Sequence, residues 1–130
     1  MPTLVRSPEQ DSHRPNASAV VSKAVVRAAS ALGINNIALA RTLGISEASA
    51  SRLQNGAYLI PVDSKPYELA LLLIRLFRGL DAMMGGEDVP VRSWMSVRNN
   101  ALHGTPRDLI MSVTGLVATV GYVDSARARL

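Results

Sequence analysis

Cysteine is absent from this chain of 130 residues, and aromatic residues make up only 4% of it. The absence of cysteine excludes disulfides, cysteine-ligated zinc and thiol nucleophiles, and it suits a reducing compartment. Because aromatics are so few, the core must be built mainly from Ala, Leu, Val and Ile, and a hydrophobic fraction of 48% is enough to form one. This composition favours closely packed helices over a β-sandwich.

Residues that carry catalysis or bind metals are also scarce. The two histidines, His13 and His103, do not form a pair with the spacing of helical metal ligands. Glu87 and Asp88 are adjacent and project in different directions, which makes them a poor acid–base pair. No serine lies in a nucleophile elbow, and no glycine-rich phosphate-binding motif is present. We therefore expect no enzymatic activity, no cofactor and no metal site.

A long hydrophobic run is missing as well. Residues 1 to 16 hold no apolar stretch of signal-peptide length, and the most apolar segment, 69 to 74, is short and flanked by charges. We expect a soluble cytoplasmic protein that does not contact membranes. The net charge is +4, and Lys23 and Lys65 are the only lysines among 14 basic residues. Positive charge carried by arginine suits the binding of phosphate or carboxylate groups.

The periodicity of the apolar residues predicts an all-α chain in three parts. Residues 1 to 16 lack periodicity and are predicted to be a flexible arm, which is either disordered or touches DNA through Arg6 and Arg14. Residues 17 to 66 contain helices predicted at 19–32, 37–43 and 47–54, followed by a connector. Ser18 is the expected N-cap of the first helix, whose core stripe is expected to consist of Val20, Ala24, Ala28 and Leu32.

Residues 67 to 130 form the third part, a second helical unit. Its long first helix, 67–84, has an apolar face so broad that it must contact several neighbours or be buried in a dimer: Leu69, Leu72, Leu73, Leu76, Phe77, Leu80, Met83 and Met84. Further helices are predicted at 91–97, 106–113 and 116–127. Thr105 should cap the second of these, Gly115 should separate it from the last, and residues 99 to 104 should form a turn.

The most specific motif is LARTLGISEASASRL, at residues 39 to 53. Ala40 is small enough for another helix to cross closely, Gly44 permits a tight turn, and the helix after the turn is short and polar. With its surroundings from 19 to 55, this motif resembles the helix-turn-helix of the Xre, Cro and λ-repressor family. The resemblance implies operator DNA as a partner, with a phosphate contact from Asn36 and a recognition surface made of Glu47, Ala48, Ser49, Ser51 and Arg52.

A second motif spans the C-terminal third. It consists of Trp94-Met95, the turn NNALHGTP at 99 to 106, the segment DLI at 108 to 110, Gly115, and the run YVDSAR at 122 to 127. This pattern resembles the toxin-binding domain of the Xre/MbcA/ParS antitoxin family, except that Val123 stands in place of leucine. The resemblance implies an antitoxin for a RES-domain toxin, an enzyme that consumes NAD or uses it to ADP-ribosylate a target.

In that family the C-terminal end of the antitoxin reaches the active site of the toxin. The resemblance therefore implies toxin contacts from Arg127, Arg129, Leu130, Tyr122, Asp124, Trp94 and Asn100. Guanidinium groups can pair with acidic residues of an NAD site, or the Leu130 carboxylate can mimic a phosphate. The alternative is that the arginines are solvated and complement the dipole of the last helix. Trp94 fits a core anchor better than a partner-binding aromatic, and Asn100 fits a turn.

Quaternary structure and the competing functions follow from the same features. A homodimer is expected because one helix-turn-helix reads too few base pairs for tight binding, and the apolar face of the 67–84 helix is its candidate interface. The main alternative to an antitoxin is a stand-alone dimeric repressor whose C-terminal half serves only dimerisation. A third reading is a protein-binding inhibitor without DNA function, because Glu47, where the family often has glutamine, repels phosphate.

Overall fold

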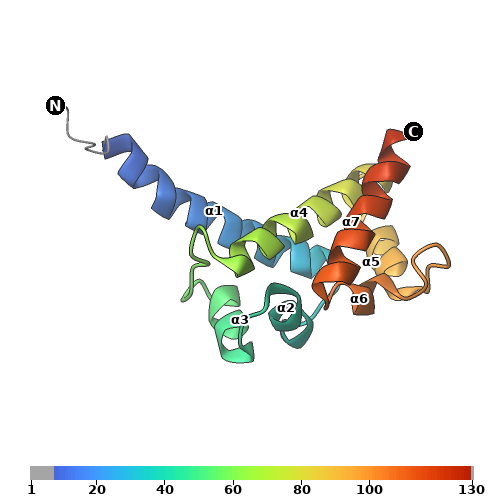
Figure 1. The fold of residues 1–130 in the computed structure, drawn as a ribbon, viewed down its shortest axis with the longest axis horizontal. Coiled ribbons are helices and arrows are strands. Elements are labelled where there is room, and N and C mark those ends of the chain that lie inside the picture. The colour runs from blue at the N-terminus through green and yellow to red at the C-terminus, as the bar shows by residue number, and fades with distance from the viewer. Residues whose placement is uncertain (1–7, 130) are drawn as a thin grey trace.

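A computed structural model describes residues 8 to 129 of the chain, with side chains from residue 16 onward. In this part the chain forms helices and no strand: α1 (Pro8–Leu32), α2 (Asn36–Leu43), α3 (Glu47–Gln54), α4 (Lys65–Met83), α5 (Asp88–Ser96), α6 (Pro106–Leu109) and α7 (Val113–Ala128). The short helices α2, α3 and α6 lie beneath the long helices α1 and α4, and α7 rises beside α4 (Figure 1). The predicted all-α fold is therefore confirmed.

One hydrophobic core connects most of the helices, and α4 lies at its centre. Buried apolar side chains from α1, α2, α3, α4, α5 and α7 form a single cluster, and α4 packs against α1, α2, α5 and α7. The broad apolar face predicted on this helix therefore contacts several neighbours within the chain. Leu69, Leu73, Leu76 and Leu80 are buried there, whereas Leu72, Phe77, Met83 and Met84 are only partly buried. The expected contact with several neighbours is confirmed, and a dimer interface on this face stays a prediction.

The first helix is longer than predicted. It begins at Pro8 rather than at residue 19, so the prediction of an irregular segment is wrong for residues 8 to 16. Residues 1 to 7, including Arg6, lie outside the described part of the chain, as does the side chain of Arg14. The core stripe also differs, because Val20 is 66% exposed and the buried positions are Val21, Val25, Ala28, Ala29 and Leu32.

The connector after α3 is attached to α1 by two buried serines. The hydroxyl of Ser18 donates to the carbonyl of Ile60, and the hydroxyl of Ser22 accepts the Ile60 N–H at 2.9 Å. Ser18 therefore lies inside α1, and the prediction that it is an N-cap is wrong. These two bonds satisfy both backbone groups of Ile60, whose side chain is fully buried.

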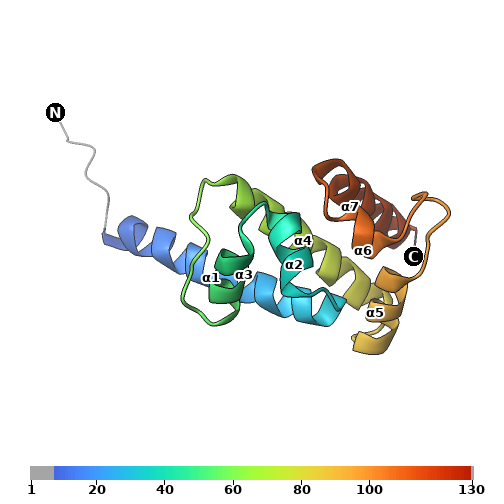
Figure 2. The same cartoon turned by 90° about the horizontal axis from the view of Figure 1, so that it is seen from below.

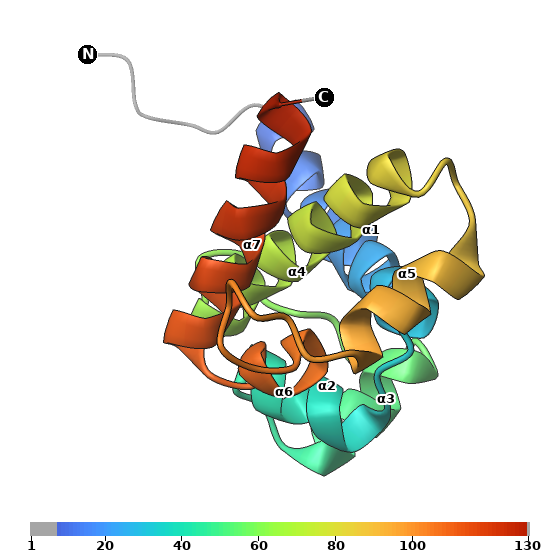
Figure 3. The same ribbon diagram turned by 90° about the vertical axis from the view of Figure 1, so that its right-hand side faces the viewer.

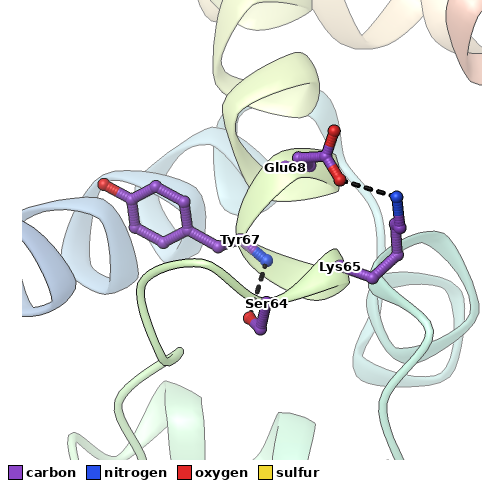
Figure 4. Close-up of polar contacts among 4 residues, drawn as sticks. All are labelled: Ser64, Lys65, Tyr67 and Glu68. Carbon is purple, nitrogen blue, oxygen red and sulfur yellow. Dashed lines mark hydrogen bonds and ion pairs between the residues drawn. The ribbon is translucent and has the colours of Figure 1, made fainter.

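The start of α4 shows why the helix includes residues assigned to the connector. Ser64 is its N-cap and accepts the N–H of Tyr67 at 3.3 Å, while Lys65 and Glu68 form an ion pair at 2.7 Å (Figure 4). Pro66 lies in the first turn of the helix rather than in the connector. Proline is tolerated there because a first-turn N–H has no partner within the helix.

The boundaries of the last helices also differ from the prediction. α5 begins at Asp88 rather than 91, α6 ends at Leu109 rather than 113, and α7 begins at Val113 rather than 116. Ser112 caps α7 by accepting the N–H of Gly115 at 3.1 Å, so Gly115 belongs to the first turn of α7 and does not break a helix. A β-carbon on Gly115 would collide with the carbonyl oxygen of Leu109, so this tight connection requires glycine. Thr105 occupies the N-cap position of α6, but its side chain makes no capping hydrogen bond.

Candidate functional site

The first candidate site is built from α2, α3 and the turn that joins them. Asn35 caps α2 by accepting the N–H of Ala38 at 2.9 Å, and Ser46 caps α3 by accepting the N–H of Ser49 at 3.0 Å. Gly44 has φ +70°, in the left-handed region that glycine adopts without a Cβ penalty. The two short helices and their glycine turn are therefore confirmed, and the predicted range of 47–54 for the second helix agrees with α3.

The outer face of α3 carries most of the residues predicted to read DNA. Ala50 and Leu53 point into the core, being 0% and 3% exposed. The opposite face exposes Glu47, Ala48, Ser51 and Arg52. Ser49 is only half-exposed, and its hydroxyl lies 3.0 Å from the capping hydroxyl of Ser46. Asn36, predicted to reach a phosphate, is exposed at the start of α2.

The second candidate site is the end of α7, which projects from the body of the molecule (Figures 1 and 3). Arg127 and Arg129 are both exposed there, and Leu130 lies outside the described residues. Asp124 is not a free carboxylate. Its two oxygens accept from Arg75 of α4, at 2.9 Å from Nη2 and 3.3 Å from Nε. This two-point ion pair ties the last turns of α7 to the middle of α4.

A close helix crossing lies beside this ion pair. Val123 of α7 packs over Gly79 of α4, where a β-carbon on residue 79 would lie 2.6 Å from Cγ1 of Val123 and 3.4 Å from Cδ of Arg127. The hydrocarbon part of Arg127 therefore runs across α4 at the glycine. Together, the crossing and the ion pair fix the direction of α7 close to its exposed arginines.

Trp94 and Tyr122 form an aromatic pair between α5 and α7. Their ring centroids lie 6.2 Å apart with an interplanar angle of 23°, and both side chains are half-buried against the core. Trp94 also lines a cavity of about 370 Å³, together with Met84, Pro90, Val97 and Arg98. The tryptophan therefore anchors the core and still presents an edge to a surface cavity.

The turn before α6 agrees with the prediction. Asn99 and Gly104 form an isolated antiparallel bridge, and the Asn99 side chain accepts the N–H of Leu102 at 3.0 Å. Asn100 is exposed within this turn. Arg75 and Gly79, in contrast, were not predicted to belong to the site, because each acquires its role from a residue of α7 that is distant in sequence.

Comparison with protein families matches both halves of the chain. Residues 11–75 match the model described as the antitoxin Xre-like helix-turn-helix domain. Residues 79–129 match the antitoxin Xre/MbcA/ParS C-terminal toxin-binding domain. The chain belongs to the Xre/MbcA/ParS antitoxin family. A comparison with curated proteins found no match.

Each match covers one of the two sites of the antitoxin. The helix-turn-helix match contains α2 and α3, so this family implies DNA binding by that part of the chain. The toxin-binding match runs from Gly79 to Arg129 and implies a toxin partner for the surface formed by α5, α6 and α7. None of the described helices combines the length and apolarity needed to cross a bilayer.

Proposed function

We propose that this antitoxin acts in the cytoplasm and neutralises a RES-domain toxin by inserting the end of α7 into the active site of the toxin. The observation that carries the proposal is the exposed pair Arg127 and Arg129, placed at the end of a helix that is fixed to α4. A side chain held in one direction before binding loses less conformational entropy when it enters a cleft.

The chemistry of the toxin's substrate supports arginine as the blocking group. We expect acidic residues in a site that consumes NAD or uses it for ADP-ribosylation, and a guanidinium can bind a carboxylate at two points. The carboxylate of Leu130 is the second candidate group, because it can replace a phosphate of the pyrophosphate. Either contact would exclude NAD without any catalytic residue in the antitoxin, which agrees with our expectation that it is not an enzyme.

The other predicted toxin contacts divide into two roles. Asp124 acts indirectly, because its carboxylate is already paired with Arg75. Three other residues would contact the toxin around its cleft. Tyr122 of α7 and Trp94 of α5 are partly exposed, and Asn100 is fully exposed. A half-buried aromatic pair is a typical anchor in such an interface, because it adds apolar area without a large loss of side-chain entropy.

We also propose that the antitoxin represses its own operon as a homodimer. Asn36 would contact a phosphate, and Glu47, Ala48, Ser49, Ser51 and Arg52 would face the bases of one half-site. A two-fold partner would supply the second half-site. The four buried leucines of α4 cannot form the dimer surface, which leaves the partly buried members of the same face as candidates: Leu72, Phe77, Met83 and Met84.

Two variants test whether the end of α7 neutralises the toxin. A chain ending at Asp124 keeps Val123 over Gly79 and keeps the ion pair with Arg75, so it should fold normally. Arg127→Ala combined with Arg129→Ala removes the two guanidinium groups and leaves α7 at full length, although it also removes the hydrocarbon part of Arg127 that lies across Gly79. Each variant is co-expressed with the product of the adjacent gene, and cellular NAD and growth are measured. We expect both variants to lose protection of NAD.

Arg52→Ala serves as the matched control, because it removes an exposed arginine from the other site. It should protect NAD as the wild type does while losing affinity for operator DNA. If the truncated chain still protects NAD, the proposed blocking mechanism is wrong. An adjacent gene that encodes no RES-domain protein would argue for the repressor alone.

A further inference from the structure

A groove between α2 and α6 brings together arginines from the two halves of the antitoxin. The groove has a volume of about 340 Å³, and Arg41 of α2 and Arg107 of α6 both line it. Both residues are exposed, and neither forms an ion pair with another described residue. Two arginines against the single carboxylate of Asp108, which also lines the groove, leave a net positive charge that favours an external anion.

This groove lies on the same side of the molecule as the helix-turn-helix. Seen from below, α3, α2 and α6 lie in a row, with α2 in the middle (Figure 2). The same three helices form the lower side of the molecule in the other views (Figures 1 and 3). A DNA duplex that receives α3 in its major groove and runs along this row would pass α2 and reach α6.

The backbone that carries Arg107 is held rigidly, although α6 has a single turn. Pro106, just before the arginine, is buried, and Ile110 is fully buried. The carbonyl of Leu109 packs so closely on α7 that a β-carbon on Gly115 would collide with it. Arg107 is therefore an exposed side chain on a fixed support, which lowers the entropy cost of binding a phosphate.

We infer that Arg107 and Arg41 bind the phosphate backbone of DNA beside the recognition site. The DNA-binding surface thus extends from the helix-turn-helix into the toxin-binding domain. The inference rests on the proposed DNA binding and adds a contact outside the helix-turn-helix. α2 and α3 carry only Arg41 and Arg52 against Glu47, so the charge of Arg107 would add to a weakly positive surface. Asp108 lines the same groove and opposes the contact, since a carboxylate repels phosphate.

The salt dependence of DNA binding tests the inference. Fluorescence anisotropy measures binding of the full-length antitoxin to two duplexes, the DNA upstream of its own gene and a scrambled sequence of the same composition. Arg107→Ala should weaken binding to both duplexes roughly tenfold at moderate salt, the effect of one lost charge-assisted hydrogen bond. It should also lower the slope of log K against log salt by about 0.9, the value for one phosphate.

Three further variants separate a phosphate contact from a general effect of charge. Arg107→Lys should keep the salt slope, and Asp108→Asn should tighten binding to both duplexes. Arg78→Ala is the matched control, because Arg78 is an exposed arginine in the last part of α4. This end of α4 points away from the row formed by α3, α2 and α6 (Figures 1 and 3). Arg78→Ala should leave the slope unchanged. Circular dichroism checks that every variant is folded.

The outcomes distinguish this inference from the DNA binding on which it rests. If the wild type binds neither duplex at low salt, the proposed DNA binding fails. If the wild type binds but Arg107→Ala changes affinity and slope no more than Arg78→Ala, only the contact from α6 is wrong. If Arg107→Ala weakens toxin binding and leaves DNA binding intact, the inference is wrong and the residue belongs to the toxin interface.

Discussion

Val123 of α7 packs over Gly79 of α4 so closely that a β-carbon on residue 79 would lie 2.6 Å from a methyl carbon of the valine. Glycine in the interior of a helix costs about 1 kcal/mol relative to alanine, so its place inside an apolar helix needs an explanation. The explanation is the crossing itself, because only a residue without a side chain lets α7 approach α4 this closely.

Gly79→Ala should lower the free energy of unfolding by about 1–3 kcal/mol, because the added methyl must displace a buried valine. Gly121→Ala is the matched control. Gly121 is exposed on α7, where a β-carbon meets nothing within 4 Å, so alanine there should stabilise the helix by up to about 1 kcal/mol. Urea unfolding followed by circular dichroism measures both. The same change in stability for both substitutions would contradict the close crossing.

Ser22→Ala should destabilise the antitoxin by about 1–3 kcal/mol, because it leaves the N–H of Ile60 buried without a partner. Ser30→Ala tests the same substitution at an exposed position of the same helix, and it should change stability by less than about 0.5 kcal/mol. Thermal unfolding compares the two variants. If Ser22→Ala unfolds at the same temperature as the wild type, the hydrogen bond from Ile60 to Ser22 does not contribute to the stability of the protein.

Arg75→Ala should cost less than about 1 kcal/mol of stability, because the ion pair is partly solvated, with 64% of the arginine side chain and 34% of the Asp124 side chain exposed. It should nevertheless weaken toxin binding, because the last turns of α7 lose an attachment to α4. A double-mutant cycle with Asp124→Asn, measured by calorimetric titration of the toxin, separates two explanations. An indirect role predicts that Asp124→Asn has little further effect in Arg75→Ala, whereas a direct toxin contact predicts an additive loss.

Arg52→Ala should reduce operator affinity by roughly 1–3 kcal/mol and relax specificity, if the guanidinium reads a base. Glu47→Gln should have the opposite effect on affinity, because it removes an exposed negative charge from the face of α3. Electrophoretic mobility shifts over a salt series measure both variants on operator and scrambled DNA. Unchanged binding by Arg52→Ala would remove that residue from the recognition surface.

Local signals predicted much of this fold. Asn35, Gly44 and Ser46 lie within a few residues of the groups that they cap or turn, so the sequence identified α2 and α3 with nearly correct bounds. The periodicity of the long α4 was also clear. At the chain ends the local signals misled, since prolines suggested an irregular start where α1 is helical, and Gly115 suggested a break inside the first turn of α7.

Contacts between distant residues could not be predicted in the same way. The hydrogen bonds of Ser18 and Ser22 with Ile60 and the pairing of Arg75 with Asp124 join positions with no spacing rule between them. Arg127 and Arg129 were identified from the motif, but the support beneath Arg127 was not, because Gly79 is recognisable as a contact only when α7 is seen to cross it. Tertiary packing assigned these roles.

The helix α4 belongs to both halves of the antitoxin. The match to the helix-turn-helix domain ends at residue 75 and the match to the toxin-binding domain starts at residue 79, and both positions lie inside this one helix. If the end of α7 binds the toxin and α3 binds DNA, the continuous helix α4 between these sites would hold the two partners in a fixed relative orientation. Because α4 contributes buried side chains to one core shared by both halves, we expect that limited proteolysis does not release either half as a folded unit.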